Sequence, residues 1–267
     1  MRLIEPAPAK LNLALHVRGK LADGRHALET IFAFCTDGDR IEGEPSKSMT
    51  LEISGPFAAG LSADDNLVLR AASALAEAAT IEPNVSMALI KKLPVASGIG
   101  GGSADAAATL RLLTGMWGID PKHAEKIAPI LGSDVPACLL SLSARGSGAG
   151  EDLQLIDDPT IAGTPVLLVN PRIALSTAEV FAAWDGVDHG SLGDWRDGRN
   201  DLEAPARSLV PEIGDVLDWL KGREGANFVR MSGSGATCFA LFDNEEARDE
   251  AAASCPSDWW HLATFLR

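Results

Sequence analysis

One stretch constrains this chain more than any other: the glycine-rich run over 94–108, with the sequence PVASGIGGGSADAAA. Apolar residues alternate along 85–90 just before it, which predicts a strand. Apolar residues recur at helical spacing along 106–117 just after it, which predicts a helix. We predict that Ser103 caps this helix, because its hydroxyl can accept a hydrogen bond from an amide two or three residues further on. The glycines therefore lie where a loop enters a helix N-terminus.

Such a loop suits a bound anion. Glycines let backbone amides approach a ligand closely, and a helix N-terminus adds unpaired N–H donors and partial positive charge. Phosphate is the usual anion at such a site. A flexible linker is the alternative, but a linker would not lead directly from a strand into an alanine-rich helix. The candidate phosphate-binding residues are Val95, Ala96, Ser97, Gly98, Ile99, Gly100, Gly101, Gly102 and Ser103.

The spacing of these glycines excludes two common phosphate loops. No Lys follows them as a P-loop requires, and the G-x-G-x-x-G spacing of a dinucleotide fold is missing. The pattern P-x-x-x-G-I-G-G-G-S-A-D-A-A instead resembles the ATP loop of the GHMP kinases. It most resembles the branch that phosphorylates diphosphocytidyl-methylerythritol in the non-mevalonate isoprenoid pathway. The resemblance implies a two-lobed α+β fold with the active site in the cleft between the lobes. The D-D-P segment at 157–159 predicts the lobe boundary, so the N-terminal lobe spans 1–156 and the C-terminal lobe 157–267.

Composition limits the setting and the partners. The 267 residues are 46% hydrophobic, enough for one large or two small cores, and no run of 18 apolar residues predicts a membrane span. The N-terminus lacks the apolar region of a signal peptide. The four cysteines are widely spaced, which favours buried free thiols over zinc ligands and suggests a reduced, cytoplasmic setting. The net charge of −14 argues against nucleic-acid binding, so attraction of a polyanionic substrate must be local.

Lys10 and Asn12 lie in a segment whose apolar residues alternate from 11 to 17, which predicts a half-buried strand. Being two residues apart, they project from the same face of that strand. A polar cleft and a solvated sheet face are equally compatible with this pattern. The resemblance favours the cleft, because P-A-K-L-N-L is similar to the first GHMP signature, whose Lys and Asn line the substrate site.

The resemblance also implies a cytosine site. The turn 23–26 carries His26, which matches the family, and Arg25, where the family usually has an aromatic residue. Arg25 can still stack its planar guanidinium on a base. Thr177 and Phe181 correspond to residues near the cytidine, with Phe181 stacking on the ring. On the residues alone, Phe181 is almost as compatible with ordinary core packing, and His26 with a structural role.

For two further candidate site residues, Asn66 and Asp134, helix capping is the alternative to a role at the active site. The segment D-D-N-L-V at 64–68 predicts the start of a helix with a capping acid, and Asn66 could be a second cap, whereas the resemblance places Asn66 beside the adenine of ATP. Asp134 precedes a short apolar run, as a helix cap does. The segment around it, S-D-V-P, resembles the family's G-(A/S)-D-V-P, whose Asp is the proposed catalytic base.

Several other segments are predicted from local patterns. Residues 29–34 and 49–53 read as strands, with D-G-D at 37–39 as a turn between them. The glycine-rich segment 144–151 is as compatible with a hairpin as with a ligand loop. The segment 232–235, S-G-S-G, predicts a hairpin turn and also matches the third GHMP signature, which closes over the phosphates. The three signatures occur in the family's order, so the resemblance covers nearly the whole chain.

The implied reaction is phosphoryl transfer from ATP, with Mg²⁺, to the 2-hydroxyl of diphosphocytidyl-methylerythritol. Asp134 would take the hydroxyl proton, and Lys10 would stabilise Asp134 and the transferred phosphoryl group. No set of acidic metal ligands is evident in the sequence. Two alternatives stay open: a related GHMP kinase acting on homoserine or a mevalonate derivative, and a GHMP-fold sensor without turnover, against which Lys10 and Asp134 argue. The sequence does not decide the oligomeric state.

Overall fold

A computed structural model describes all residues, 1–267, and the chain forms two compact units. Unit 1 contains Met1–Ala9, Asp37–Val95 and Gly100–Ser141, and unit 2 contains Lys10–Thr36, Ala96–Ile99 and Leu142–Arg267. The chain therefore alternates between the units, and the glycine-rich stretch contributes residues to both. The predicted division of the sequence after residue 156 stays a prediction.

Unit 1 has a small sheet built around β4 (Val85–Ile90). β4 pairs in parallel with β3 (Thr50–Ser54) and antiparallel with the end of β2 (His26–Pro45). The odd-numbered side chains of β4, which begin with Val85, are buried, and the even-numbered ones are partly exposed. The alternation in the sequence therefore predicted this strand correctly.

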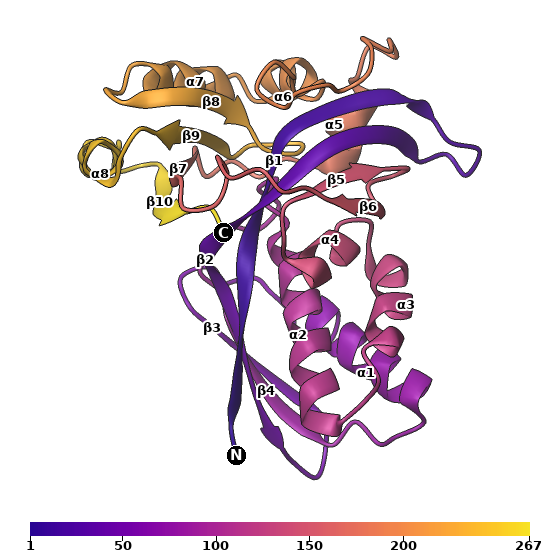
Figure 1. The fold of residues 1–267 in the computed structure, drawn as a ribbon. Helices are drawn as coiled ribbons and strands as arrows, with labels where there is room; N and C mark the ends of the chain where they lie inside the picture. The colour runs from indigo at the N-terminus through magenta and orange to yellow at the C-terminus, as the bar shows by residue number, and fades with distance from the viewer. The chain divides into compact units, whose positions relative to one another are not determined.

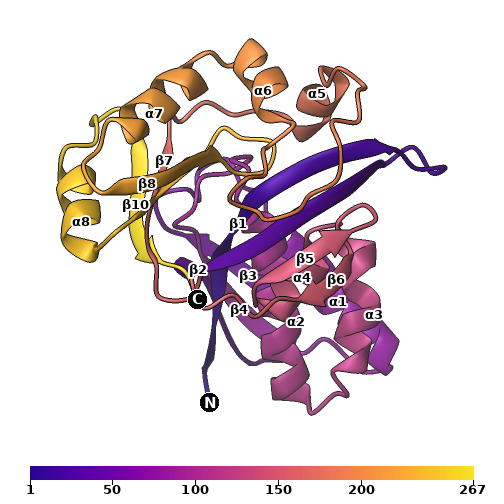
Figure 2. The same cartoon turned by 45° about the horizontal axis from the view of Figure 1, so that its top comes forward.

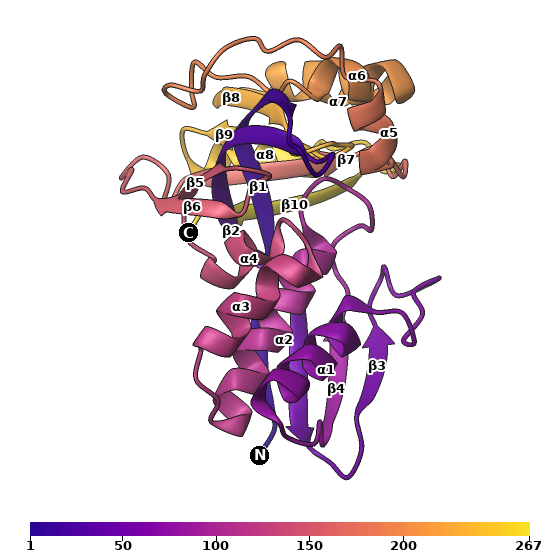
Figure 3. The ribbon, with the colours of Figure 1, turned by 90° about the vertical axis from the view of Figure 1, so that its right-hand side faces the viewer.

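Four helices complete unit 1 and pack against one another (Figure 3). α2 (Gly101–Trp117) contacts each of the other three and buries a run of alanines at 104 and 106–108. These small side chains allow the helix axes to approach closely, so the alanine-rich segment after the glycines serves packing. The other three helices are α1 (Leu67–Ala79), α3 (Lys122–Leu131) and α4 (Val135–Leu140).

The turn predicted at 37–39 is wrong, because β2 continues through these residues. A Cβ atom at Gly38 would lie 2.1 Å from the backbone oxygen of Ala7, so Gly38 permits close approach of β1 rather than a change of direction. Asp39, which suggested a polar turn, is a buried residue with hydrogen-bonded partners.

Unit 2 contains an antiparallel sheet in the order β10-β7-β9-β8. Figure 2 shows β8 and β10 of this sheet. One face of this sheet shares a buried core with α7 (Glu212–Lys221) and with residues of α8 (Glu245–Ala253). Ile213, Leu217 and Leu220, which helical spacing places on one face of α7, lie in that core. The strands are β7 (Pro165–Asn170), β8 (Ala226–Met231), β9 (Cys238–Phe242) and β10 (Trp260–Phe265).

The long strand β1 (Leu3–Lys20) pairs with β2 and carries the first polar signature (Figure 1). β5 (Ala144–Ser147) and β6 (Asp152–Leu155) pair antiparallel, so the glycine-rich segment 144–151 forms a hairpin. The remaining helices are α5 (Thr177–Ala182) and α6 (Glu203–Leu209). The four cysteines are free thiols, three of them buried, and none of the helices is both long and apolar enough to cross a bilayer.

Candidate active site

The side chains of Lys10 and Asn12 meet on one buried face of β1, with exposed fractions of 3% and 2%. Lys10 Nζ donates a hydrogen bond to Asn12 Oδ1 at 2.8 Å, and Asn12 Nδ2 donates to Thr30 Oγ1 at 2.8 Å. The Thr30 hydroxyl in turn donates to the Ala14 carbonyl at 2.6 Å. The prediction that both residues share a face is confirmed, and the alternative of a solvated sheet face is wrong.

Hydrogen bonds connect this face to two other signature segments within unit 2. Ser232 Oγ accepts from the Asn12 amide at 3.2 Å and donates to the Gly98 carbonyl at 3.0 Å. The Lys10 amide donates to the Ile99 carbonyl at 3.0 Å, and the Thr237 amide donates to the Ser97 carbonyl at 3.1 Å. Unit 2 therefore brings together β1, part of the glycine-rich stretch and the hairpin at 232–235, three segments that lie far apart in the sequence.

Gly98 makes this contact possible because no side chain fits at its position. A Cβ atom there would lie 2.5 Å from the Ser232 oxygen and 2.6 Å from the Gly235 oxygen, and φ of Gly98 is +77°. Asn200 holds the opposing hairpin, since its Nδ2 donates to the Met231 and Gly233 carbonyls at 2.8 Å each. Sequence analysis did not identify this role, because a lone Asn before a helix reads only as a local capping residue.

In unit 1, the helix after the glycines begins earlier than predicted. Gly100 is the N-cap of α2, with φ +66°, and the helix starts at Gly101, so the prediction that Ser103 is the cap is wrong. A glycine adopts this left-handed conformation without strain, which lets the helix start two residues before Ser103. The first intrahelical bond runs from the Ala104 amide to the Gly100 carbonyl at 2.8 Å. The amides of 101–103 therefore have no acceptor within the helix, as an anion site requires.

Asn66 and Asp134, for which helix capping was the alternative role, differ in whether their side chains cap a helix. Asn66 caps α1, because its Oδ1 accepts from the Val68 amide at 3.0 Å, so the cap is Asn66 and not the acidic residue that was expected. Asp134 occupies the N-cap position of α4, yet its side chain makes no capping hydrogen bond. Capping therefore does not account for the carboxylate of Asp134. The adenine contact predicted for Asn66 stays a prediction.

The residues expected at the cytosine include a compact aromatic cluster. The His26 ring stacks on Phe181 with 4.4 Å between centroids, and Trp184 meets His26 edge-on at 5.6 Å. His26 Nε2 and Trp184 Nε1 are both buried without a hydrogen-bond partner. Burial, together with nearby Lys20, lowers the pKa of His26. Two unpartnered ring nitrogens in one cluster favour a polar ligand, since leaving such groups unpaired is costly.

Two other predicted cytidine residues lie in different surroundings. Thr177 Oγ1 is 2.9 Å from Ser234 Oγ, which connects α5 to the 232–235 hairpin. Arg25 is half exposed and forms ion pairs with Asp23 at 2.8 Å and Glu151 at 3.1 Å. Its stacking on a base stays a prediction. Sequence analysis missed Trp184, because a Trp just after a short helix carries no signal that distinguishes a ligand contact from core packing.

A second buried polar cluster lies in unit 1 and was also missed. Lys91 forms ion pairs with Asp39 and, at 2.7 Å, with Asp105, and all three side chains are at most 4% exposed. Burial raises the pKa of Asp105 to about 7 although Lys91 opposes this shift. Burial also opposes the charge of Lys91, but Asp105 and Asp39 outweigh it and raise the pKa of Lys91. The ammonium therefore stays charged, while burial disfavours the charged form of Asp105.

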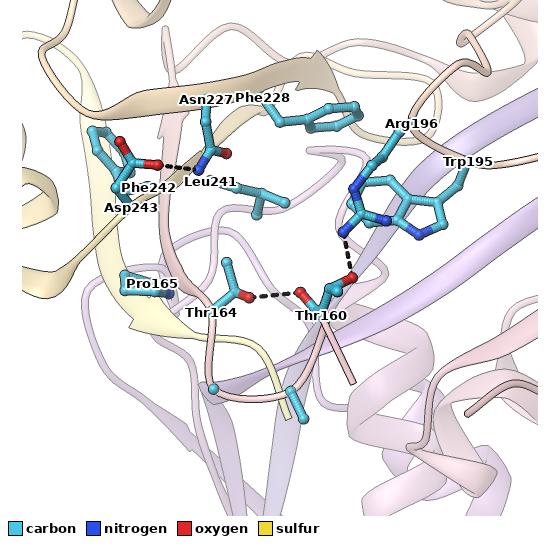
Figure 4. Close-up of a pocket in the computed structure, with 12 residues that line it drawn as sticks. Thr160, Thr164, Pro165, Trp195, Arg196, Asn227, Phe228, Leu241, Phe242 and Asp243 are labelled. Carbon is cyan, nitrogen blue, oxygen red and sulfur yellow. Dashed lines mark hydrogen bonds between the residues drawn. The ribbon is translucent and has the colours of Figure 1, made fainter. Parts of the chain in front are cut away.

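A cavity of about 700 Å³ lies elsewhere in unit 2 (Figure 4). Its polar side chains pair with one another: Asn227 donates to Asp243 at 2.8 Å, and Arg196 donates to Thr160. None of the signature residues lines it, so it is not the candidate active site. No group of three or more His, Cys, Asp or Glu side chains is arranged to hold a metal ion.

Comparison with known proteins identifies the class of protein. Residues 66–141 match the GHMP kinases N-terminal domain, and residues 185–261 match the GHMP kinases C-terminal domain. The 4-diphosphocytidyl-2-C-methyl-D-erythritol kinase of Rhizorhabdus wittichii is 50% identical over 281 residues, covering 100% of this chain and 96% of the relative. The chain is therefore a GHMP kinase and belongs to the family of 4-diphosphocytidyl-2-C-methyl-D-erythritol kinases.

Solved structures agree with this assignment. A crystal structure of 4-(cytidine 5'-diphospho)-2C-methyl-D-erythritol kinase superposes with a TM-score of 0.85 at 33% identity, covering 100% of this chain and 99% of the other. A homoserine kinase from Cytophaga hutchinsonii gives a TM-score of 0.71 at 17% identity, covering 99% and 95% of the two chains. The second similarity shows the fold alone. The expected α+β GHMP kinase fold is confirmed.

The contact at Gly98 leads to a first prediction. Gly98→Ala forces a side chain against Ser232 and Gly235 and places alanine at a left-handed φ, which alone costs about 1–2 kcal/mol. We expect a lower melting temperature and a higher KM for ATP, measured by thermal unfolding and steady-state kinetics. Gly115→Ala is the matched control, because nothing lies within 4 Å of its Cβ and alanine favours a helix interior by about 0.5–1 kcal/mol. Equal behaviour of the two variants would contradict the role of Gly98.

Proposed function

We propose that the protein transfers the γ-phosphoryl group of ATP to the 2-hydroxyl of 4-diphosphocytidyl-2-C-methyl-D-erythritol, in the non-mevalonate route to isoprenoid precursors. The observation that carries this choice of substrate is the aromatic cluster of His26, Phe181 and Trp184. Its two ring nitrogens have no hydrogen-bond partner within the chain, which supports a polar ligand such as the edge of cytosine. The full-length similarity to kinases with this substrate in their name supports the same choice.

In this proposal the amides of 95–103 hold the phosphates of ATP, and Asn66 borders the adenine. The unpaired first-turn amides of α2 and the partial positive charge of its N-terminus favour this placement. Mg²⁺ is written here as part of the substrate MgATP. The protein offers no cluster of three acidic, His or Cys ligands, so the phosphate oxygens of ATP would supply most of the coordination.

The chemistry needs a proton acceptor and a positive charge at the reacting groups. The 2-hydroxyl oxygen attacks the γ-phosphorus, the bond to the ADP oxygen breaks, and the hydroxyl proton passes to the Asp134 carboxylate. Lys10 stabilises the charge that develops on the transferred phosphoryl group. Its hydrogen bond to Asn12 holds the ammonium in place, and Asn12 in turn is fixed by Thr30.

The acceptor specificity is tested directly. Purified protein with MgATP is offered diphosphocytidyl-methylerythritol, homoserine or mevalonate in parallel, and ADP release is followed. We expect turnover with the cytidine substrate alone, because the other alcohols have no base to fill the aromatic cluster. Turnover of homoserine or mevalonate instead would establish a related GHMP kinase. ATP binding without turnover of any acceptor would indicate a sensor.

A further prediction concerns Asp134 and Lys10. Asp134→Asn keeps the shape of the side chain and removes the base, so kcat should fall by about 10²–10⁴-fold with little change in KM. Lys10→Ala should also lower kcat, because the transferred phosphoryl group loses its charge partner. The double variant should lose less than the product of the two single losses, since groups that act together are not additive.

A stability measurement separates this role from a structural one. If Asp134→Asn keeps near-native kcat and only melts at a lower temperature, Asp134 stabilises α4 and is not the base. The kinetic and thermal measurements are made on the same protein preparations, so that loss of folded protein is not read as loss of catalysis.

Phe181 gives the prediction for the base site. Phe181→Ala should weaken binding of the cytidine substrate by about 1–3 kcal/mol through lost stacking, with ATP affinity unchanged. Calorimetry with each ligand measures both. Phe228→Ala is the control, because this partly buried aromatic of the same unit packs on Trp195 and belongs to no signature. Equal loss of affinity for both ligands in Phe181→Ala would identify Phe181 as a core residue.

A further inference from the structure

The buried ammonium of Lys91 lies directly against the first turn of α2. A Cβ atom at Gly101 would be only 3.0 Å from Lys91 Nζ, so the glycine is what allows the ammonium to reach the helix backbone. Asp105, one turn further along α2, accepts a hydrogen bond from the same nitrogen at 2.7 Å. Lys91 therefore contacts α2 at the turn that carries the unpaired amides.

Lys91 is itself fixed by a hydrogen bond and an ion pair to the sheet of unit 1. Its backbone amide donates to the Ser54 carbonyl at 2.7 Å, and its ammonium pairs with Asp39 on β2. Asp39 is fixed in turn, because its Oδ1 accepts from the amides of Lys92 at 2.5 Å and Leu93 at 2.8 Å. The three side chains thus join α2 to β2 and to the segment that follows β4.

We infer that Lys91 is a positioning residue for the phosphate site, which holds the first turn of α2 and the backbone of Gly101 at a fixed place in unit 1. This inference rests on the proposed function, because it takes that turn to bind the ATP phosphates. Lys91 is almost fully buried, so it acts through the backbone of the turn.

The composition of the cluster supports a role in positioning rather than in stability. Two carboxylates share one ammonium, and Asp105 Oδ1 is buried with no hydrogen-bond partner. Buried ion pairs of this kind are often no more stable than apolar side chains of the same volume. An ammonium between two carboxylates does, however, fix distances and directions that apolar contacts leave adjustable.

The inference is tested with Lys91→Met, which keeps the length of the side chain and removes its charge. ATP affinity is measured by calorimetry with MgATP, and KM is measured for ATP and for the alcohol substrate. We expect the ATP affinity to fall at least about tenfold, since displacement of a binding group by about 1 Å can cost 10²-fold. The KM of the alcohol should change less than about twofold, and the amide of Ala104, which donates to the Gly100 carbonyl, should exchange hydrogen faster.

Two further variants keep the test decisive. Lys91→Met/Asp105→Asn removes one of the two buried carboxylates that the single variant leaves without a counter-ion, and it should show the same loss of ATP affinity. Arg111→Met is the matched control, because Arg111 also anchors α2 within unit 1, through Glu5 at 2.6 Å and the Cys138 carbonyl at 2.7 Å. It lies more than two turns from Gly101, so it should lower the melting temperature and leave ATP affinity unchanged.

The outcomes separate this inference from the function on which it rests. Wild-type protein that binds no ATP would overturn the proposed function. Wild-type binding together with unchanged affinity in both Lys91 variants overturns only the role of Lys91. Loss of ATP affinity in Arg111→Met as large as in the Lys91 variants also overturns it, because any loosening of α2 would then have the same effect.

Discussion

The close approach of two backbone segments at Gly98 is the constraint on which unit 2 depends. The carbonyl of Gly98 accepts from Ser232, and the hairpin oxygens lie where a Cβ atom would be. Because Ser232 also accepts from the Asn12 amide, the same contact sets the distance between the hairpin and β1. Lys10 is therefore positioned by contacts among segments far apart in the sequence, and its own strand would not suffice.

In unit 1, buried charged side chains position a backbone segment in a comparable way. The turn that opens α2 is placed by Lys91, Asp39 and Asp105, while Gly101 supplies the space that the ammonium needs. The glycines of the stretch thus have different tasks: Gly98 admits a neighbouring hairpin, Gly100 adopts the left-handed cap conformation, and Gly101 admits a side chain. A description of the stretch as a flexible loop would miss these differences, since each glycine meets a particular steric requirement.

The sequence predicted the features that depend on local patterns. Alternation identified β4, helical spacing identified α2, and the two-residue spacing placed Lys10 and Asn12 on one face. Predictions failed where a distant segment decides the local conformation. The D-G-D segment reads as a turn, but β1 packs against Gly38 and Asp39 is held by the chain after β4, so β2 continues.

Site residues show the same limit. Motif similarity singled out His26 and Phe181, whereas Trp184 and Asn200 have no local signal and acquire their roles only through contacts made on folding. The Lys91 cluster is hidden for the same reason, because its carboxylates come from 39 and 105, on either side of Lys91 in the sequence. Residues that act through a neighbour rather than on the ligand are in general the ones that a single sequence does not reveal.

The negative net charge of the chain adds an electrostatic reason for these contacts. A net charge of −14 repels nucleoside polyphosphates at long range, so their binding must depend on short-range groups. In the proposed site, the backbone amides at the N-terminus of α2 and the buried side chain of Lys10 are such groups. Their effect is strong only within a few ångströms and in surroundings from which water is excluded. Short-range attraction in turn tolerates little displacement. In the proposed phosphate site, each part of the glycine-rich stretch is held within its own unit, Gly98 through Ser232 in unit 2 and Gly101 through Lys91 in unit 1.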